Sequence, residues 1–149
     1  MKYIIVLISI ITLSISCTKE EDFSEQNRKD IIKYIEDNNL DATRSESGLY
    51  YVINKTGTGI HPNISSNVTV AYKGYFTDGK VFDQSSNYGI SFSLQNVIKG
   101  WTEGITYFKK GGEGILLIPS NLGYGNADKG KIPGGSVLIF DIKLIKINY

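Results

Sequence analysis

Five segments of the chain carry the alternation of apolar and polar side chains, or the density of β-branched and aromatic residues, that predicts β-strands. They are residues 48–54, 67–76, 90–94, 113–118 and 136–147. In the second segment Val68, Val70 and Tyr72 share one face, because successive side chains of a strand point to opposite sides. The last segment gathers an apolar face in the same way, from Leu138, Phe140, Ile142 and Leu144. These patterns predict a sheet with one buried face.

Apolar residues at helical spacing predict a short amphipathic helix over residues 24–38. Ser24 stands at a plausible N-cap position, and Ile31, Ile32 and Ile35 follow one turn apart among charged residues. The apolar stripe is narrow. We therefore expect this helix to pack against the rest of the domain, or against a partner, without itself making a core.

A second helix is predicted over residues 95–107. Its apolar residues recur at helical spacing at Val97, Ile98, Trp101, Ile105 and Phe108. Two glycines, Gly100 and Gly104, lie inside it, and a glycine inside a helix costs about 1 kcal/mol relative to alanine. A short helix lying close against a sheet explains both glycines. The predicted fold class is therefore α+β, a curved antiparallel β-sheet wrapping one short α-helix.

Composition agrees with a single small domain rich in turns and aromatic strands. The chain has 149 residues, with 10 Tyr, 6 Phe and 16 Gly. Its 16 Lys and Arg against 15 Asp and Glu leave a net charge of +1, and no basic tract concentrates that charge. This balance argues against nucleic acid as a partner.

The N-terminus predicts export and a lipid anchor. Lys2 precedes an apolar run over residues 4–15, which is too short for a comfortable membrane span and is typical of a signal peptide. Cys17, the single cysteine, follows where bacterial lipoproteins carry their lipidated residue, although Ser14 occupies the place where such signals commonly have leucine. The alternative is a secreted protein whose leader happens to contain a cysteine. We favour lipidation.

This interpretation divides the chain into a lipoprotein signal peptide (1–16), a lipidated tether with a short amphipathic helix (17–47) and a folded domain (48–149). It places the mature protein in the bacterial cell envelope, attached to the membrane through the lipid. The outer membrane is the favoured location, on its periplasmic face or at the cell surface. Residues 18–22 resemble a surface-export tag of Bacteroidetes-type lipoproteins, and they equally fit a solvated linker.

The residue inventory argues against most kinds of enzymatic chemistry. His61 is the single histidine, so neither a histidine-based metal site nor a Ser-His-Asp triad is expected. Cys17 lies outside the predicted domain and cannot serve it as a nucleophile. The glycine-rich stretches 57–59 and 111–114 do not complete a phosphate-binding or dinucleotide loop. No metal and no cofactor is therefore predicted.

A series of motifs in fixed order carries a more specific signal. They are Val70-Ala-Tyr72-Lys-Gly74-Tyr-Phe76, Asp78-Gly79-Lys80-Val81-Phe82-Asp83, Phe92-Ser-Leu94, Val97-Ile98-Lys-Gly100-Trp101-Thr-Glu103-Gly104, Lys110-Gly111-Gly112, Ile118-Pro119, Tyr124-Gly125, Ile132-Pro133 and Leu138-Ile-Phe140-Asp141-Ile142. Over residues 48–147 their order and gaps resemble the FKBP-type peptidyl-prolyl cis/trans isomerases. With the predicted anchor, the chain is similar to a Bacteroidetes-like lipoprotein form of that family.

The resemblance implies a hydrophobic prolyl pocket with Trp101 as its floor. The residues implied as catalytic are Tyr72, Phe82, Asp83, Trp101, Tyr124 and Phe140. Those implied to bind substrate are Val97, Ile98 and Ile132. The backbone N–H of Ile98 and the hydroxyl of Tyr124 would hold the bound peptide, and Asp83 would orient a neighbouring tyrosine hydroxyl. The implied partners are proline-containing polypeptides and macrolides such as rapamycin.

Three departures from the family pattern surround this implied pocket. No arginine follows Asp83, so the partner of its carboxylate is open. Ile90 stands where many members have a second pocket aromatic, and the loop over residues 126–131 is polar and charged. Two functions are consistent with these residues. One is an isomerase that assists the folding of exported or cell-envelope proteins, and the other is a non-catalytic, lipid-anchored chaperone or assembly factor that holds proline-containing segments.

Overall fold

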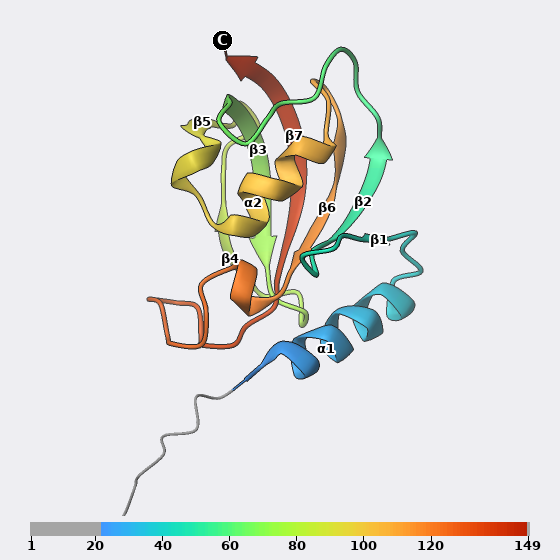
Figure 1. Cartoon of the computed structure of the whole chain (residues 1–149), viewed down its shortest axis with the longest axis vertical. Coiled ribbons are helices and arrows are strands. Elements are labelled where there is room, and N and C mark those ends of the chain that lie inside the picture. The colour runs from blue at the N-terminus through green and yellow to red at the C-terminus, as the bar shows by residue number, and fades with distance from the viewer. Residues whose placement is uncertain (1–21, 149) are drawn as a thin grey trace, which may run out of the picture.

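A single antiparallel sheet organises the computed structural model, which describes residues 22–148. Its strands run in the order β1-β2-β6-β7-β3-β4, and β5 pairs with β3. The bounds are β1 (Thr43–Arg44), β2 (Tyr50–Lys55), β3 (Asn67–Tyr75), β4 (Val81–Gln84), β5 (Ile90–Ser93), β6 (Glu113–Ile118) and β7 (Leu138–Asn148). The sheet curves around the helix α2 (Figure 1), so the predicted fold class is confirmed. The predicted signal peptide and Cys17 lie outside the described residues.

All five predicted strands are present, as β2, β3, β5, β6 and β7. The sequence pattern missed β1, which is two residues long, and β4, in which only Phe82 is partly buried. Short strands at the margin of a sheet keep most side chains in solvent, so they show no alternation that could be recognised.

The predicted helix over residues 95–107 is shorter than expected. The chain forms a 3₁₀ turn at Leu94–Asn96, then α2 at Lys99–Gly104 and a second 3₁₀ turn at Ile105–Tyr107. Extended backbone at Val97 and Ile98, with ψ of 174° and 148°, breaks the helix between the first two pieces. The hydroxyl of Thr102 donates to the carbonyl of Leu94 at 2.6 Å and ties the two sides of the break together.

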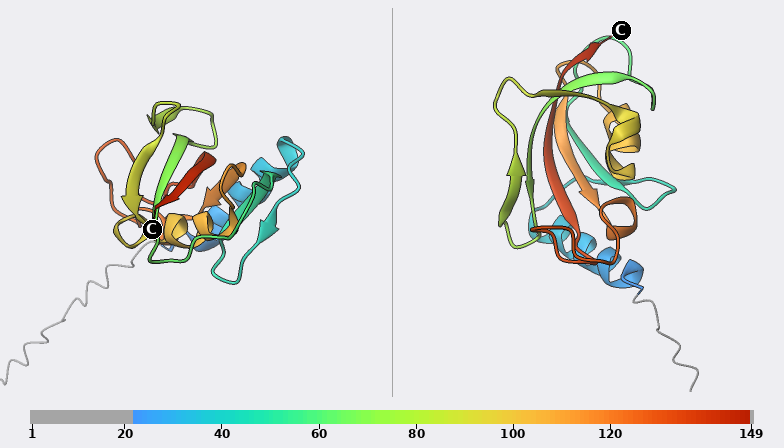
Figure 2. Two further views of the ribbon diagram at one scale, coloured as in Figure 1. Left: turned by 90° about the horizontal axis from the view of Figure 1, so that it is seen from above. Right: turned by 90° about the vertical axis from the view of Figure 1, so that its left-hand side faces the viewer.

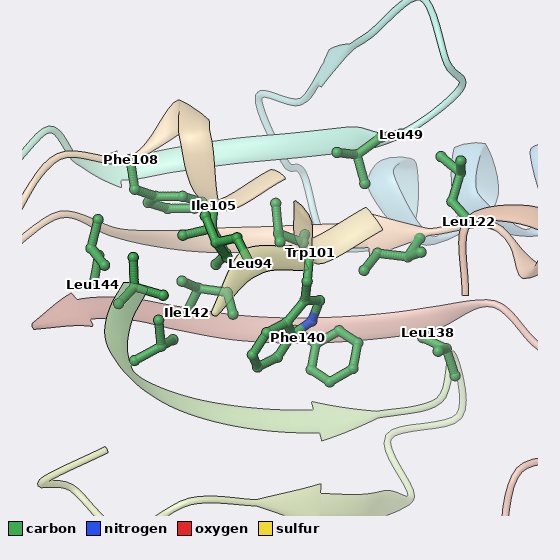
Figure 3. Packing of buried hydrophobic residues seen from close by; sticks show 14 of the residues in the cluster. Leu49, Leu94, Trp101, Ile105, Phe108, Leu122, Leu138, Phe140, Ile142 and Leu144 are labelled. Carbon is green, nitrogen blue, oxygen red and sulfur yellow. The ribbon is translucent and has the colours of Figure 1, made fainter. Parts of the chain in front are cut away.

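The two glycines of α2 lie close against β6, as predicted. A Cβ at Gly100 would come within 2.6 Å of the Ile118 side chain, and one at Gly104 within 2.7 Å of Leu116. Trp101, Ile105 and Phe108 then enter the main core, between α2 and the concave face of the sheet (Figure 3). The strands contribute most of the other members, among them Val68, Val70, Leu138, Phe140, Ile142 and Leu144.

The helix α1 (Ser24–Asp37) covers one end of the sheet on the opposite face (Figures 1 and 2). The neighbours of Leu117 in β6 belong to the main core, so Leu117 itself points to the opposite face of the sheet. There it forms a second cluster with Ile31 of α1. Tyr50, Val137 and Ile139 complete this cluster. The helix thus packs against the domain, as one of the two predicted alternatives. It also contributes a residue to a second small core, which the narrow apolar stripe did not predict.

The N-terminus of α1 differs from the prediction. Ser24 is the first helical residue, and its backbone N–H donates to the carboxylate of Asp22 at 2.9 Å. Phe23 occupies the N-cap position without a side-chain cap. Within residues 22–148, no helix is long and apolar enough to cross a membrane.

Glu103 fastens α2 to the turn between β1 and β2. Its carboxylate accepts hydrogen bonds from the Ser47 hydroxyl at 2.6 Å and from the Tyr107 hydroxyl at 2.8 Å. Burial pushes the pKa of Glu103 upward, but hydrogen bonds from Ser47, Ser45 and Tyr107 outweigh it and hold the pKa below the ordinary 4.5. Since a lowered pKa in the folded state favours folding of the ionised form, this contact stabilises the protein above pH 4.5.

We therefore expect Glu103→Gln to lower the free energy of unfolding at pH 7. The difference from the unchanged protein should shrink as the pH falls below the ordinary pKa of 4.5, because protonation then removes the same stabilisation. Urea unfolding at a series of pH values measures it. Glu46→Gln is the matched control, since Glu46 is exposed and has no side-chain hydrogen bond within the described chain. A difference for Glu103→Gln that is constant with pH would contradict the prediction.

Candidate functional site

A cavity of about 790 Å³ opens where the N-terminal end of α2 meets β3, β4, β5, β7 and the loop before β7. Its lining residues are Tyr72, Phe82, Asp83, Ile90, Phe92, Asn96, Val97, Ile98, Trp101, Tyr124, Lys129, Lys131, Ile132 and Phe140. All the residues that the sequence placed in a prolyl pocket are among them. Segments more than sixty residues apart in the sequence, such as β3 at Tyr72 and β7 at Phe140, meet here.

Trp101 forms the floor of this cavity and is only 6% exposed. Its ring centroid lies 4.9 Å from that of Tyr72 and 5.1 Å from that of Phe140, in both cases nearly edge to face. Phe92 adds a third ring at 5.3 Å. Aromatic pairs prefer such arrangements, which fix ring orientations beyond the effect of burial alone. The floor is therefore a rigid apolar surface.

The wall beside the floor depends on a glycine. Phe82 stands edge to face against Phe140 with centroids 5.5 Å apart. Both rings approach the backbone of β3 at Gly74, where a Cβ would lie 2.7 Å from ring atoms of each. Gly74 thus leaves room for the two rings to meet, which explains a glycine in the interior of a strand.

The carboxylate of Asp83 accepts a hydrogen bond from the Tyr72 hydroxyl at 2.6 Å. This contact answers the question left by the missing arginine, because the carboxylate has a hydrogen-bond donor from the neighbouring strand. Burial, and then the hydrogen bond to Asp83, raise the pKa of Tyr72 far above its usual value. The Tyr72 hydroxyl therefore stays protonated at neutral pH and donates to Asp83.

One buried polar group of the cavity floor has no hydrogen-bond partner in the described part of the chain. The indole Nε1–H of Trp101 is buried and donates to no acceptor among residues 22–148. Figure 3 shows this nitrogen, in blue, on the side of the indole next to the Phe140 ring. An unpaired buried donor costs about 1–3 kcal/mol. The floor thus holds no polar side chain close enough to satisfy even its own N–H group.

Tyr124 projects from the loop before β7 and remains 41% exposed. Burial, and then the charge of Asp83, raise the pKa of its hydroxyl, which is therefore protonated at neutral pH. No hydrogen bond engages this hydroxyl within residues 22–148, and none engages the backbone N–H of Ile98. Both donors are thus available to a bound peptide.

Five lining residues were not among the site residues implied by the sequence, namely Ile90, Phe92, Asn96, Lys129 and Lys131, although Ile90 and the loop over residues 126–131 were noted as departures around the implied pocket. The two in β5 could have been found, because Ile90 and Phe92 share a face of the predicted strand by alternation. The two lysines have no such signal. They belong to the loop before β7, in a turn closed by an isolated bridge between Lys129 and Ile132, and only the fold brings that loop to the cavity.

The cavity offers binding and desolvation more readily than bond-breaking chemistry. Its side chains include no histidine, cysteine or serine. His61 lies elsewhere on the surface, with Nδ1 3.0 Å from the carbonyl oxygen of Thr106. Among the described residues, no group of three or more His, Cys, Asp or Glu side chains could hold a metal ion. An apolar ligand with one or two backbone carbonyls fits these surroundings best.

Comparison with known families gives one match, to the model of FKBP-type peptidyl-prolyl cis-trans isomerases over residues 59–145. Among curated relatives, FkpA of Buchnera aphidicola (subsp. Baizongia pistaciae) is 48% identical over 109 residues, which are 72% of this chain and 43% of that protein. FkpA of Escherichia coli K12 is 46% identical over 105 residues, covering 69% and 39%. Both carry the description FKBP-type peptidyl-prolyl cis-trans isomerase. The chain spans less than half the length of these relatives.

Solved structures give the same result for the fold. The crystal structure of E. coli FkpA matches with a TM-score of 0.71 at 37% identity, covering 85% of this chain and 62% of that one. A peptidyl-prolyl cis-trans isomerase from Pseudomonas syringae pv. tomato matches with a TM-score of 0.73 at 30% identity, covering 87% and 98%. The second comparison spans nearly the whole of the known enzyme.

Proposed function

The chain belongs to the FKBP-type peptidyl-prolyl cis-trans isomerase family, and on that premise we propose that it accelerates the isomerisation of X-Pro bonds in polypeptides. The observation that carries the proposal is the apolar cavity over Trp101, around which the fold gathers every residue implied by the family resemblance. The activity is useful in folding, because uncatalysed isomerisation takes tens to hundreds of seconds.

The proposed mechanism is desolvation of the twisted amide. Rotation about the X-Pro bond must overcome a barrier of about 18–20 kcal/mol that arises from amide resonance. The planar amide has the larger dipole, so water stabilises it more than the twisted form. A ring floor at Trp101, walled by Phe82 and Phe140, excludes water and thereby lowers the barrier.

Polar groups at the margin hold the peptide in place. The free N–H of Ile98 donates to a peptide carbonyl, and the Tyr124 hydroxyl offers a second donor across the cavity. Asp83 acts indirectly by fixing the Tyr72 hydroxyl and with it the ring that meets Trp101. No group removes or delivers a proton to the substrate, which fits a reaction in which no bond is broken.

The proposed substrates are proline-containing segments of exported or cell-envelope proteins, and macrolides such as rapamycin are proposed to compete for the same cavity. The location rests on the sequence alone. A charged residue and an apolar run followed by Cys17 support export, lipidation at that cysteine and attachment to the bacterial outer membrane. Palmitate labelling of cells that express the chain, compared with Cys17→Ser, tests the anchor.

The activity is tested on a protein whose refolding is limited by proline isomerisation. The purified chain should increase the rate of the slow phase in proportion to its concentration, and rapamycin should suppress the increase. The fluorescence of Trp101, the single tryptophan, should change when a ligand enters the cavity. A refolding rate equal to background, with peptide binding intact, would overturn the enzymatic proposal and favour a holding chaperone.

A further inference from the structure

We propose that this cavity selects prolines flanked by an acidic residue, and that Lys129 and Lys131 are the residues that determine this preference. The inference rests on the proposed function, since it concerns the substrate class of the same site. Both lysines line the cavity and both are exposed, so they make one section of its rim cationic.

A tight turn holds the two lysines at the rim. The N–H of Lys129 donates to the carbonyl of Ile132 at 2.8 Å, and the N–H of Ile132 donates back to the carbonyl of Lys129 at 3.0 Å. Gly130 supplies the positive φ of 59° that the turn requires. Because Ile132 is itself a wall residue, this reciprocal pairing ties the backbone of Lys129 and Lys131 to the apolar wall.

Neither lysine forms an ion pair with another side chain among residues 22–148. The ion pairs of the described chain lie elsewhere, on α1 and around Glu113. Asp128, the acidic neighbour in the loop, does not line the cavity and accepts a hydrogen bond from the N–H of Gly134 at 2.8 Å.

The remaining charged residue on the cavity lining is Asp83 of β4, whose carboxylate accepts a hydrogen bond from the Tyr72 hydroxyl. Two cations against one hydrogen-bonded carboxylate leave an excess of positive charge at the rim. A peptide whose proline enters the apolar floor presents its flanking side chains to this rim. A carboxylate there gains from the lysines, whereas a lysine is repelled.

The expected preference is moderate, because exposed charge pairs in water are weak and are screened by salt. With four peptides that differ only in the residue before proline (Glu, Gln, Leu or Lys), kcat/KM for Glu should exceed that for Gln by about threefold to tenfold at low ionic strength. The Lys peptide should be the slowest. At roughly 1 M salt, where the Debye length is about 3 Å, the Glu and Gln values should converge. Exchange NMR measures these rates without an auxiliary protease.

The decisive variant is Lys129→Gln/Lys131→Gln, which should bring the Glu and Gln peptides to about equal kcat/KM. Lys110→Gln/Lys146→Gln is the matched control, since it removes the same charge from exposed positions that do not line the cavity. This control should keep the preference. A second set of four peptides, with Glu, Gln, Leu or Lys placed directly after the proline, tests the preference on the C-terminal side.

The outcomes separate the two proposals. A Glu preference at neither flank, or one that survives loss of both lysines, overturns this inference even if the neutral peptides are isomerised efficiently. If no peptide is isomerised, the proposed activity fails, but the inference is still decided by affinity. Titration followed by Trp101 fluorescence would then support it only if the Glu peptide binds more tightly than the Gln peptide and the lysine variant loses that difference.

Discussion

Replacing Trp101 with leucine is expected to lower kcat/KM for a proline-containing peptide by about tenfold or more, equivalent to about 1.4 kcal/mol of transition-state stabilisation. The indole forms the floor of the cavity. Its ring centroid lies 4.9 Å from that of Tyr72 and 5.1 Å from that of Phe140. Leucine keeps the site apolar but leaves space for water beneath the X-Pro bond. Admission of water favours the planar amide and raises the barrier.

The control for this variant is Phe108→Leu. Phe108 is fully buried in the same core, but it does not line the cavity. Both substitutions should reduce stability by about 1–3 kcal/mol, as is usual for aromatic-to-aliphatic changes in a core. Only Trp101→Leu should reduce kcat/KM per folded molecule, as counted by urea unfolding curves. Equal losses for the two variants would place the effect in the core in general and not in the floor.

Replacing Asn27 with alanine is expected to lower the free energy of unfolding by about 2–4 kcal/mol. Asn27 is 2% exposed, and its amide joins α1 to two distant loops. Nδ2 donates to the carbonyl of Gly135 at 2.7 Å, and Oδ1 accepts from the N–H of Ser120 at 2.7 Å. Truncation leaves one buried acceptor and one buried donor unsatisfied, which costs more than the net worth of the bonds themselves.

Gln26→Ala is the matched control for this prediction. Gln26 is the neighbouring residue of the same helix, but it is exposed and bonds only to Asp30 on the helix surface. Its replacement should change stability by less than about 0.5 kcal/mol. The two residues that Asn27 holds, Ser120 and Gly135, bracket the loop that carries Tyr124 and Ile132. Hydrogen exchange in residues 120–135 should therefore increase in Asn27→Ala alone, and an unchanged loop with a loss below 1 kcal/mol would contradict the prediction.

Local sequence patterns were sufficient for most of the sheet. The period of two in segments such as Val68, Val70 and Tyr72 arises from the pleat of the strand itself. It can therefore be recognised from consecutive residues without knowing which strands pair with each other. The two glycines of α2 likewise predicted that the helix lies close against the sheet. The structure confirms this, because the helix backbone lies against Ile118 and Leu116 there. Where the pattern failed, at β1 and β4, the strands bury too little to leave a local signal.

The break in the second predicted helix could not be read from periodicity. Val97 and Ile98 are apolar and lie at the spacing of a helical face, so the pattern continues through them. The structure instead extends the backbone there, which turns both residues toward the cavity and frees the N–H of Ile98. A requirement of the site overrides helical propensity at that point.

The sequence by itself determined the fold class and the absence of a histidine pair or a domain cysteine that could carry other chemistry, because these follow from residue types and spacings along the chain. Nine of the residues that line the apolar pocket were implied by the family resemblance of the sequence. Tertiary structure alone decided that the tyrosine paired with Asp83 is Tyr72, that Asn27 joins α1 to the pocket loop and that Lys129 and Lys131 stand at the rim. Each of those contacts joins residues from separate elements, and the geometry of a polar group's partner depends on how the elements pack, which no local pattern encodes.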